Sequence, residues 1–371
     1  MKKYYAVFII LIFLGFSYGM YVGIAKTFPY DALNSLYDKI TQDSSKYSNE
    51  NSEVYEKDVK SLIHITSTDD ITTKKNELVK YIWKDRGFPH STLPLVTHNI
   101  DDNRFFDLKN LKRIDKIATL MEYDVNSVAY LFLADQNNND LIIYHQGHDG
   151  DFIKGKNTIQ YFLNKGYSVL AFSMPLLGMN DQPVVELSGF GITKLVSHNQ
   201  FTFLESESFS PIKFFVEPIA VSLNYMDKEF DFNHYYMIGI SGGGWTGILY
   251  PALDDRVLQS YSIAGSLPIF LRHIDDNLGD YEQILPELYK IADYLDLYIM
   301  ASYGENRKLV QIFNKFDPCC FSGNYYITYE NEVKTKLFTL GKGSFEVYLD
   351  DTHREHKISE YALNLIYKSL I

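Results

Sequence analysis

The sequence is poor in cysteine and has no excess of positive charge. Its only two cysteines, Cys319 and Cys320, are adjacent, so they cannot join distant segments of the chain. We therefore expect neither a disulfide framework nor a cysteine-ligated zinc site. Lys and Arg number 35 against 47 Asp and Glu, which gives a net charge of −12. Without a basic stripe this balance argues against nucleic acid as a partner.

The N-terminus carries a long run without charged residues. It follows Lys2 and Lys3 and covers residues 4–25. About 20 apolar residues span the hydrocarbon core of a bilayer, so we predict a single transmembrane anchor within residues 1–27. The two lysines favour a cytoplasmic N-terminus, which puts the rest of the chain on the extracytoplasmic side. The alternative is a signal segment that is cleaved to give a secreted protein, with residues 23–25 as the cleavage site.

The remaining chain divides into two parts. Residues 28–112 are predicted to form an N-terminal extension with a polar stretch at 41–57, a strand at 61–66 and a helix at 72–84. Residues 113–371 alternate short apolar runs with helix-length segments, which predicts an α/β domain with a mostly parallel sheet covered by helices on both faces. The expected strands are 114–121, 128–134, 141–145, 168–173, 235–240, 258–263, 309–313 and 345–349, and the clearest helices are 158–164, 211–227 and 359–370.

The sharpest chemical signal is a serine between glycines. The pattern Gly239-x-Ser241-x-Gly243 comes directly after the apolar strand 235–240 and before a helix. A tight strand-to-helix turn with small neighbours lifts the serine hydroxyl above the sheet, as a nucleophile requires. The N–H of Gly242 lies at the helix N-terminus, where partial positive charge stabilises an oxyanion. A dinucleotide-binding turn would come after the first strand of the sheet, whereas this one comes late.

With this motif, residues 113–371 resemble an α/β-hydrolase, and the resemblance covers about two-thirds of the chain. It implies a catalytic triad in the chain order serine, acid, histidine. The loop 144–150, Tyr-His-Gln-Gly-His-Asp-Gly, is similar to the oxyanion loop of the family. The backbone N–H of His148 is then the second oxyanion donor beside Gly242.

The resemblance also gives places for the acid and the base. Asp317, after strand 309–313, is the expected acid, and Glu305 is the alternative if residues 295–300 form the strand instead. The base is expected in the loop before the last helix, where His353 and His356 compete and His356 is slightly preferred. Only one imidazole can contact both the serine and the carboxylate.

These residues predict a serine hydrolase that cleaves carboxylic esters, including acyl groups on carbohydrate or lipid. The alternatives are a serine peptidase of the same fold and an inactive binding or assembly protein. No cofactor is expected. A metal site is not expected either. A rival interpretation makes the acidic and histidine side chains of residues 145–151 metal ligands. That set is His145, His148, Asp149 and Asp151.

Overall fold

A computed structural model describes residues 13, 15–21, 58–274 and 278–370 of the chain, whose internal contacts divide it into the units Met1–Ser52 and Glu53–Ile371. In the first unit, residues 15–21 are helical. Within the described ranges, no helix combines the length and the apolar character needed to cross a bilayer. Most of the predicted anchor and the polar stretch at 41–57 fall outside the described residues, so the anchor stays a prediction.

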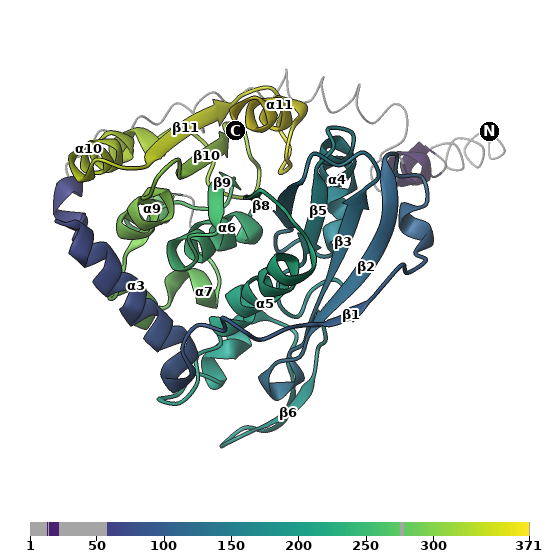
Figure 1. Cartoon of the computed structure of the whole chain (residues 1–371), viewed down its shortest axis with the longest axis horizontal. Coiled ribbons are helices and arrows are strands. Elements are labelled where there is room, and N and C mark those ends of the chain that lie inside the picture. Colours follow the sequence, from purple (N-terminus) through teal and green to yellow (C-terminus); the bar gives the residue numbers. More distant parts are fainter. Residues whose placement is uncertain (1–12, 14, 22–57, 275–277, 371) are drawn as a thin grey trace, which may run out of the picture. The chain divides into compact units, whose positions relative to one another are not determined.

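A nine-stranded sheet organises the described part of the second unit (Figure 1). Its spatial order is β1-β2-β3-β5-β4-β8-β9-β10-β11. The pairs from β5 through β11 are parallel, and β1, β2 and β3 add antiparallel strands at one edge. The strands are β1 Leu95–Thr97, β2 Leu111–Thr119, β3 Ser127–Ala134, β4 Asp140–His145, β5 Ser168–Phe172, β8 His234–Ile240, β9 Val257–Ile263, β10 Lys308–Asn314 and β11 Ser344–Asp350.

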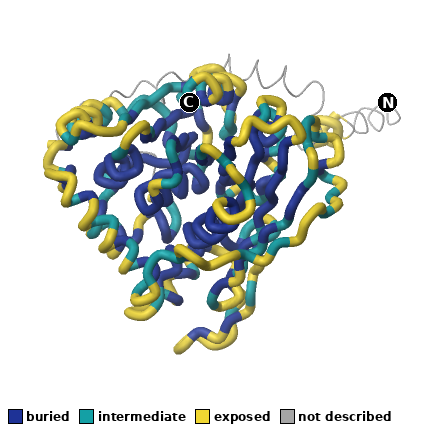
Figure 2. The backbone as a smooth tube through the Cα atoms, in the orientation of Figure 1, coloured by how far each residue is buried: buried dark blue, intermediate teal, exposed yellow. Residues whose placement is uncertain are grey.

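Helices cover both faces of this sheet because its central strands are apolar on both sides. In β8, Tyr235 and Met237 join the larger core, while Tyr236 and Ile238 join the smaller one. The larger core is packed by α3 Thr68–Trp83, α5 Lys213–Glu229, α6 Gly242–Leu253, α9 Tyr294–Ser302 and α10 Glu330–Leu340. The smaller core is packed by α4 Lys156–Leu163 and α11 Glu360–Ser369. Figure 2 shows the central strands and α6 as the buried centre of the unit.

The predicted α/β architecture is confirmed, including the antiparallel β2–β3 pair and the helices at α3, α4, α5 and α11. The strand predicted at 61–66 is wrong. A 3-10 turn forms at Val59–Leu62, and the N–H groups of His64 and Ile65 donate to the Asp296 carboxylate, at 2.9 and 3.1 Å, instead of to a neighbouring strand. The strand β1 was not predicted, since three residues beside prolines carry little pattern.

The connection between β5 and α5 is long, and its residue His198 contacts His148 in the loop after the carboxyl end of β4. It contains the hairpin β6 Val184–Leu187 and β7 Gly191–Lys194, followed by a 3-10 segment, η8 His198–Phe203. The short helix α7 Tyr281–Ile284 contacts η8. The loops that follow the carboxyl ends of parallel strands all lie at the same end of the sheet. Residues far apart in the sequence therefore come together there.

Candidate active site

Ser241 occupies a strained turn between β8 and α6. Its φ of 55° and ψ of −127° lie where residues other than glycine are seldom found. The turn is fixed by hydrogen bonds on both sides, from Ser241 N to Ile263 O at 2.9 Å and from Trp245 N to Ser241 O at 3.1 Å. A strained serine held between a strand and a helix is the geometry that exposes a nucleophilic hydroxyl.

The flanking glycines are required by close backbone contacts. A Cβ at Gly239 would lie 2.0 Å from Gly243 O, and a Cβ at Gly243 would lie 2.1 Å from His145 O. The loop after β4 is equally close, because a Cβ at Gly147 would lie 2.5 Å from Ser241 Cβ and 3.2 Å from its Oγ. The loop predicted to supply the second oxyanion donor therefore lies directly against the serine.

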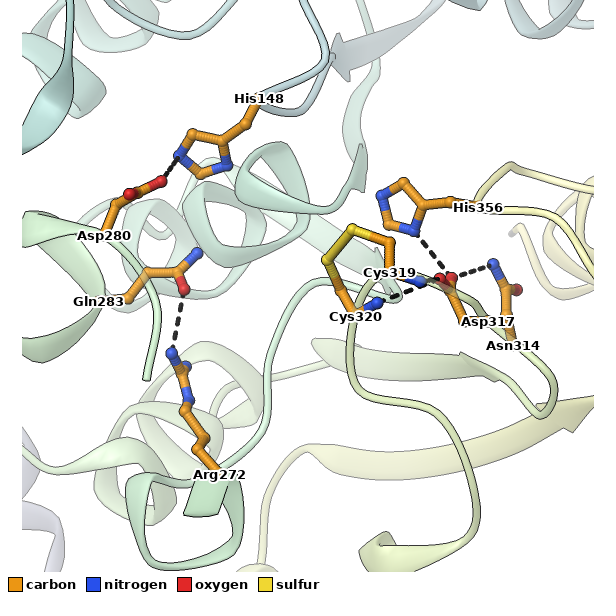
Figure 3. The surroundings of a disulfide bond; sticks show 9 residues. All are labelled: His148, Arg272, Asp280, Gln283, Asn314, Asp317, Cys319, Cys320 and His356. Atoms are coloured by element: carbon orange, nitrogen blue, oxygen red, sulfur yellow. Dashed lines mark hydrogen bonds and ion pairs between the residues drawn. A yellow bond between two sulfur atoms is a disulfide. The ribbon is translucent and has the colours of Figure 1, made fainter. Parts of the chain in front are cut away.

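His356 and Asp317 form a close pair at the same edge of the sheet. His356 Nδ1 lies 2.7 Å from Asp317 Oδ2, and the Asp317 side chain is fully buried (Figure 3). The other oxygen, Asp317 Oδ1, accepts hydrogen bonds from the N–H groups of Cys319 and Cys320 at 2.8 and 3.1 Å. Because an ionised carboxylate only accepts, Nδ1 is the nitrogen that donates, which leaves Nε2 of His356 as the basic nitrogen.

Asn314, which sequence reasoning did not single out as functional, ties this pair to the sheet. From the end of β10, its Nδ2 donates to Asp317 Oδ2 at 3.1 Å and to the carbonyl oxygen of Lys357 at 3.1 Å. One buried amide thus connects the acid loop and the histidine loop. The only sequence signal was its place at the end of a strand, where the family commonly has glycine.

The competing candidates lie elsewhere. His353 pairs through Nε2 with Asp350 Oδ2 at 3.3 Å, and its Nδ1 accepts from Glu355 N at 3.1 Å. Glu305 precedes β10, at the amino ends of the strands, and its largely exposed side chain lies 3.8 Å from Lys342 Nζ. Residues 295–300, which would have made Glu305 the acid, are part of the helix α9. The structure therefore brings together Asp317 and His356 and leaves His353 and Glu305 apart.

The serine and the histidine are not hydrogen-bonded to each other in the described part of the chain. No hydrogen bond of the Ser241 hydroxyl is found there, and the contacts of His356 Nδ1 are those to Asp317. Catalytic hydrogen bonds are often long before substrate binds, so the missing contact is compatible with a base at this position.

Two further features lie beside the Asp317–His356 pair. The adjacent residues Cys319 and Cys320 are joined by a disulfide, which closes the turn after Asp317 without linking distant segments. The Phe316 ring lies 4.9 Å from the Arg354 guanidinium, which connects the acid loop with the histidine loop a second time. Both contacts limit the freedom of the loops that carry the pair.

The structure does not bring together the rival set of metal ligands predicted within residues 145–151. Burial lowers the pKa of His145 to about 4, and its Nδ1 lies 2.9 Å from the carbonyl oxygen of Gln146. Asp149 contacts Lys154 and Gln146, and Asp151 caps the N–H of Ile153 at 2.9 Å. Among the described residues, only His148 of this set belongs to a cluster of possible metal ligands, and its neighbours there come from other segments.

Comparison with known proteins gives the fold its name. No protein-family model and no curated protein matches the chain. Among solved structures, the chain is similar to an acetyl xylan esterase from Paenibacillus sp. R4, with a TM-score of 0.51 and 12% identity over 84% of this chain and 96% of that one. It is also similar to acetyl xylan esterase 1 from Thermoanaerobacterium sp. JW/SL YS485, with a TM-score of 0.51 and 13% identity over 81% and 93% of the two chains.

A glucuronoyl esterase from Solibacter usitatus matches with a TM-score of 0.51 and 12% identity, over 82% of this chain and 93% of that one. At such identities the likeness concerns the fold. Together with the strand order and the turn at Ser241, it gives the chain the α/β-hydrolase fold, as the sequence motif predicted.

Proposed function

We propose that this protein is a serine hydrolase that cleaves carboxylic esters through an acyl-enzyme on Ser241. The observation that carries the proposal is the His356–Asp317 pair, with 2.7 Å between Nδ1 and Oδ2, at the sheet edge onto which the strained turn at Ser241 opens. Serine on such a turn, with an imidazole held by a buried carboxylate, is the arrangement used for acyl transfer on unrelated folds.

Each residue has a defined step in this proposal. Nε2 of His356 takes the hydroxyl proton as Ser241 attacks the ester carbonyl carbon, and Asp317 stabilises the imidazolium that forms. The backbone N–H groups of Gly242 and His148 hold the negative oxygen of the tetrahedral intermediate. The imidazolium then protonates the leaving alcohol. Water, activated by the same imidazole, cleaves the acyl-enzyme and releases the carboxylic acid.

The substrate class we propose is an acyl ester of a carbohydrate. Solved structures with which the chain shares its fold include acetyl xylan esterases and a glucuronoyl esterase, and both names refer to esters that contain a carbohydrate. Small acyl groups such as acetyl are the first to test.

The test compares the parent protein with Ser241→Ala and with Ser206→Ala, which removes an exposed hydroxyl from the connection between β5 and α5. Release of p-nitrophenol from p-nitrophenyl acetate, and of acetate from acetylated xylan, would be followed for each protein. We expect turnover in the parent and in S206A, and loss of turnover in S241A. Hydrolysis by S241A at the parental rate would contradict the proposal.

The predicted location belongs to the same proposal. The charge-free run at 4–25 after Lys2 and Lys3 supports a single N-terminal anchor with the hydrolase unit on the extracytoplasmic side. Protease added outside intact cells that express the chain should digest the hydrolase unit. Protection of that unit until the membrane is broken would contradict this placement.

A further inference from the structure

A second group of chemically active side chains lies beside the proposed oxyanion loop. It comprises His148 from the loop after β4, His198 at the start of η8, and Asp280 and Glu282 at α7. One ligand atom from each of the four lies within 4.8 Å of the others. The side chains of His198 and Glu282 are almost completely buried, while His148 and Asp280 keep 27% and 40% of their side-chain surface exposed. Three segments distant in sequence thus converge on one point.

Three possible hydrogen-bond acceptors surround a single nitrogen of His148, which can carry at most one proton. His148 Nε2 lies 2.9 Å from Glu282 Oε1, 3.1 Å from Asp280 Oδ2 and 3.1 Å from His198 Nδ1. A single imidazole N–H makes one good hydrogen bond. Hydrogen bonding alone therefore does not explain why two carboxylate oxygens and a second imidazole nitrogen lie so close to His148 Nε2.

The second histidine, His198, directs the lone pair of its Nδ1 toward His148 Nε2. His198 Nε2 lies 2.9 Å from the carbonyl oxygen of Pro175, which only accepts, so Nε2 carries the proton. In a neutral imidazole Nδ1 then has the free lone pair. Histidines that bind metals commonly donate their other ring N–H to a backbone carbonyl in this way. If both rings were instead doubly protonated, two N–H groups would face each other across 3.1 Å.

A buried carboxylate oxygen of Glu282 lies beside His198. Glu282 Oε2 forms no hydrogen bond, although the side chain is fully buried. It lies 3.3 Å from His198 Nδ1, which can neutralise it only when that nitrogen carries a proton. A buried charged oxygen without a partner costs free energy unless a cation is present. Two carboxylates and one divalent cation with neutral imidazoles balance to zero net charge, which suits a buried site.

We propose that His148, His198, Asp280 and Glu282 bind one divalent transition-metal ion of the zinc class. Four ligands at Zn–N and Zn–O distances of about 2.0–2.1 Å form a tetrahedron with edges of about 3.3–3.4 Å. His148 Nε2 lies 3.1 Å from both His198 Nδ1 and Asp280 Oδ2, which is close to such an edge. Glu282 can supply either oxygen, since Oε1 lies 2.9 Å from His148 Nε2 and Oε2 lies 3.3 Å from His198 Nδ1. Two imidazole nitrogens favour zinc over calcium and magnesium, which prefer oxygen ligands alone.

The position of His148 gives the ion a consequence for catalysis, and this consequence rests on the proposed function. A Cβ built at Gly242 would lie 2.4 Å from His148 Cε1, so the imidazole is packed against the residue that follows the nucleophile. Fixing this ring to η8 and α7 would also fix the backbone of His148, the proposed second oxyanion donor. The ion is then a positioning element that lowers the freedom of the oxyanion loop.

The binding test needs no ester substrate. The purified full chain would be stripped with a chelator and dialysed, and zinc chloride would then be titrated against a competing chelating dye, with bound zinc per chain counted by mass spectrometry. We expect one tightly bound zinc ion in the parent and in Ser241→Ala. Cobalt(II) at the site should show the intense visible absorption of tetrahedral coordination. A folded parent that binds no stoichiometric zinc would overturn the inference.

Variants locate the ion. Glu282→Gln and His198→Gln roughly keep side-chain size. Because each removes a direct ligand, they should weaken zinc binding by more than the about 10- to 100-fold that loss of an outer-shell partner costs. His64→Gln is the matched control, because His64 lies with Asp293 and Asp296 in another cluster where Lys74 Nζ is already 3.1 Å from Asp296 Oδ2. It should bind zinc as the parent does. Unchanged affinity in the first two variants, or loss in H64Q, would place the metal elsewhere and refute the site.

The two proposals can fail separately. If zinc binding fails while an active-site-directed fluorophosphonate still labels Ser241, only the metal site is wrong. If zinc binds and E282Q loses it while no ester is cleaved, the metal site stands and the proposed function falls. Where both hold, removing zinc should lower kcat for ester hydrolysis more than it raises KM, because an oxyanion donor acts in the transition state.

Discussion

His356 Nδ1 lies 2.7 Å from Asp317 Oδ2, across 39 residues of sequence. The carboxylate is held on both oxygens, since the N–H groups of Cys319 and Cys320 donate to Oδ1. This arrangement fixes the imidazole with Nε2 directed away from the acid, where it can accept a proton. The proposed catalytic roles depend on this orientation.

Substitution of His356 and of His353, one at a time, should show which of the two is the catalytic base. His356→Gln should lower kcat for p-nitrophenyl acetate by about 1,000-fold or more, because the base and its contact with Asp317 are both lost. His353→Gln is the matched control three residues earlier, and it should keep kcat within a few-fold of the parent. Steady-state kinetics on both variants checks this. The reverse order of effects would assign the base to His353.

Removal of the Asn314 amide should affect turnover more than substrate binding. Asn314→Ala loses two hydrogen bonds, to Asp317 and to the Lys357 carbonyl, each at 3.1 Å. Loss of a buried bond to a charged group costs about 1–3 kcal/mol, which corresponds to about a 5- to 150-fold lower kcat if it is lost at the transition state. Separate measurement of kcat and KM is the check. An unchanged kcat with a lower melting temperature would make Asn314 purely structural.

Two glycines one turn apart in α6 should respond differently to alanine. In Gly243→Ala the new Cβ would lie 2.1 Å from His145 O and 2.6 Å from Gln146 O, so the turn at Ser241 must distort. We expect loss of activity and of about 2–3 kcal/mol in the free energy of unfolding. In Gly247→Ala the nearest atom is Ser260 Oγ at 3.3 Å, and the change should stay within about 1 kcal/mol. Urea unfolding of both variants gives the comparison, and equal losses would contradict it.

A pH-dependent stability effect is expected at Asp293, the N-cap of α9. Burial and, to a smaller extent, the neighbouring Asp296 carboxylate raise its pKa from 3.8 to about 6. Between about pH 4 and pH 6, the native state therefore keeps a proton on Asp293 that the unfolded state loses. This stabilisation is present below about pH 4 and is lost as the pH rises through about 6.

Asp293→Asn stays neutral at every pH and can still accept from the N–H groups of Leu295 and Asp296. It should be more stable than the parent by on the order of 1 kcal/mol at pH 7.5 and about equally stable at pH 4. Urea unfolding at the two pH values measures the difference. A gain of the same size at both values would show that ionisation of Asp293 is not the cause.

The sequence predicts the sheet and the serine turn because both are local. Apolar runs define strands, and the small residues around Ser241 are needed for contacts within a few residues and with the next strand. The choice of Asp317 over Glu305 also follows once residues 295–300 are known to be helical, which their apolar character alone does not decide.

The remaining parts of the site depend on contacts that leave no periodic signal. His353 and His356 both follow β11, and only the direction of the loop decides which one contacts Asp317. His148 and Glu282 are 134 residues apart, and their meeting depends on how a long connection and a short helix fold. The rival interpretation of the sequence grouped His148 with its neighbours in the chain, which the structure does not bring together.

The most direct test of the account is the site of covalent labelling. The full chain would be treated with a fluorophosphonate, digested and analysed by mass spectrometry, with H356Q and S241A treated in parallel. We predict one adduct, on Ser241, that is formed much more slowly in H356Q and not at all in S241A. An adduct on another residue, or labelling of S241A at the rate of the parent, would contradict the assignment of Ser241 as the nucleophile.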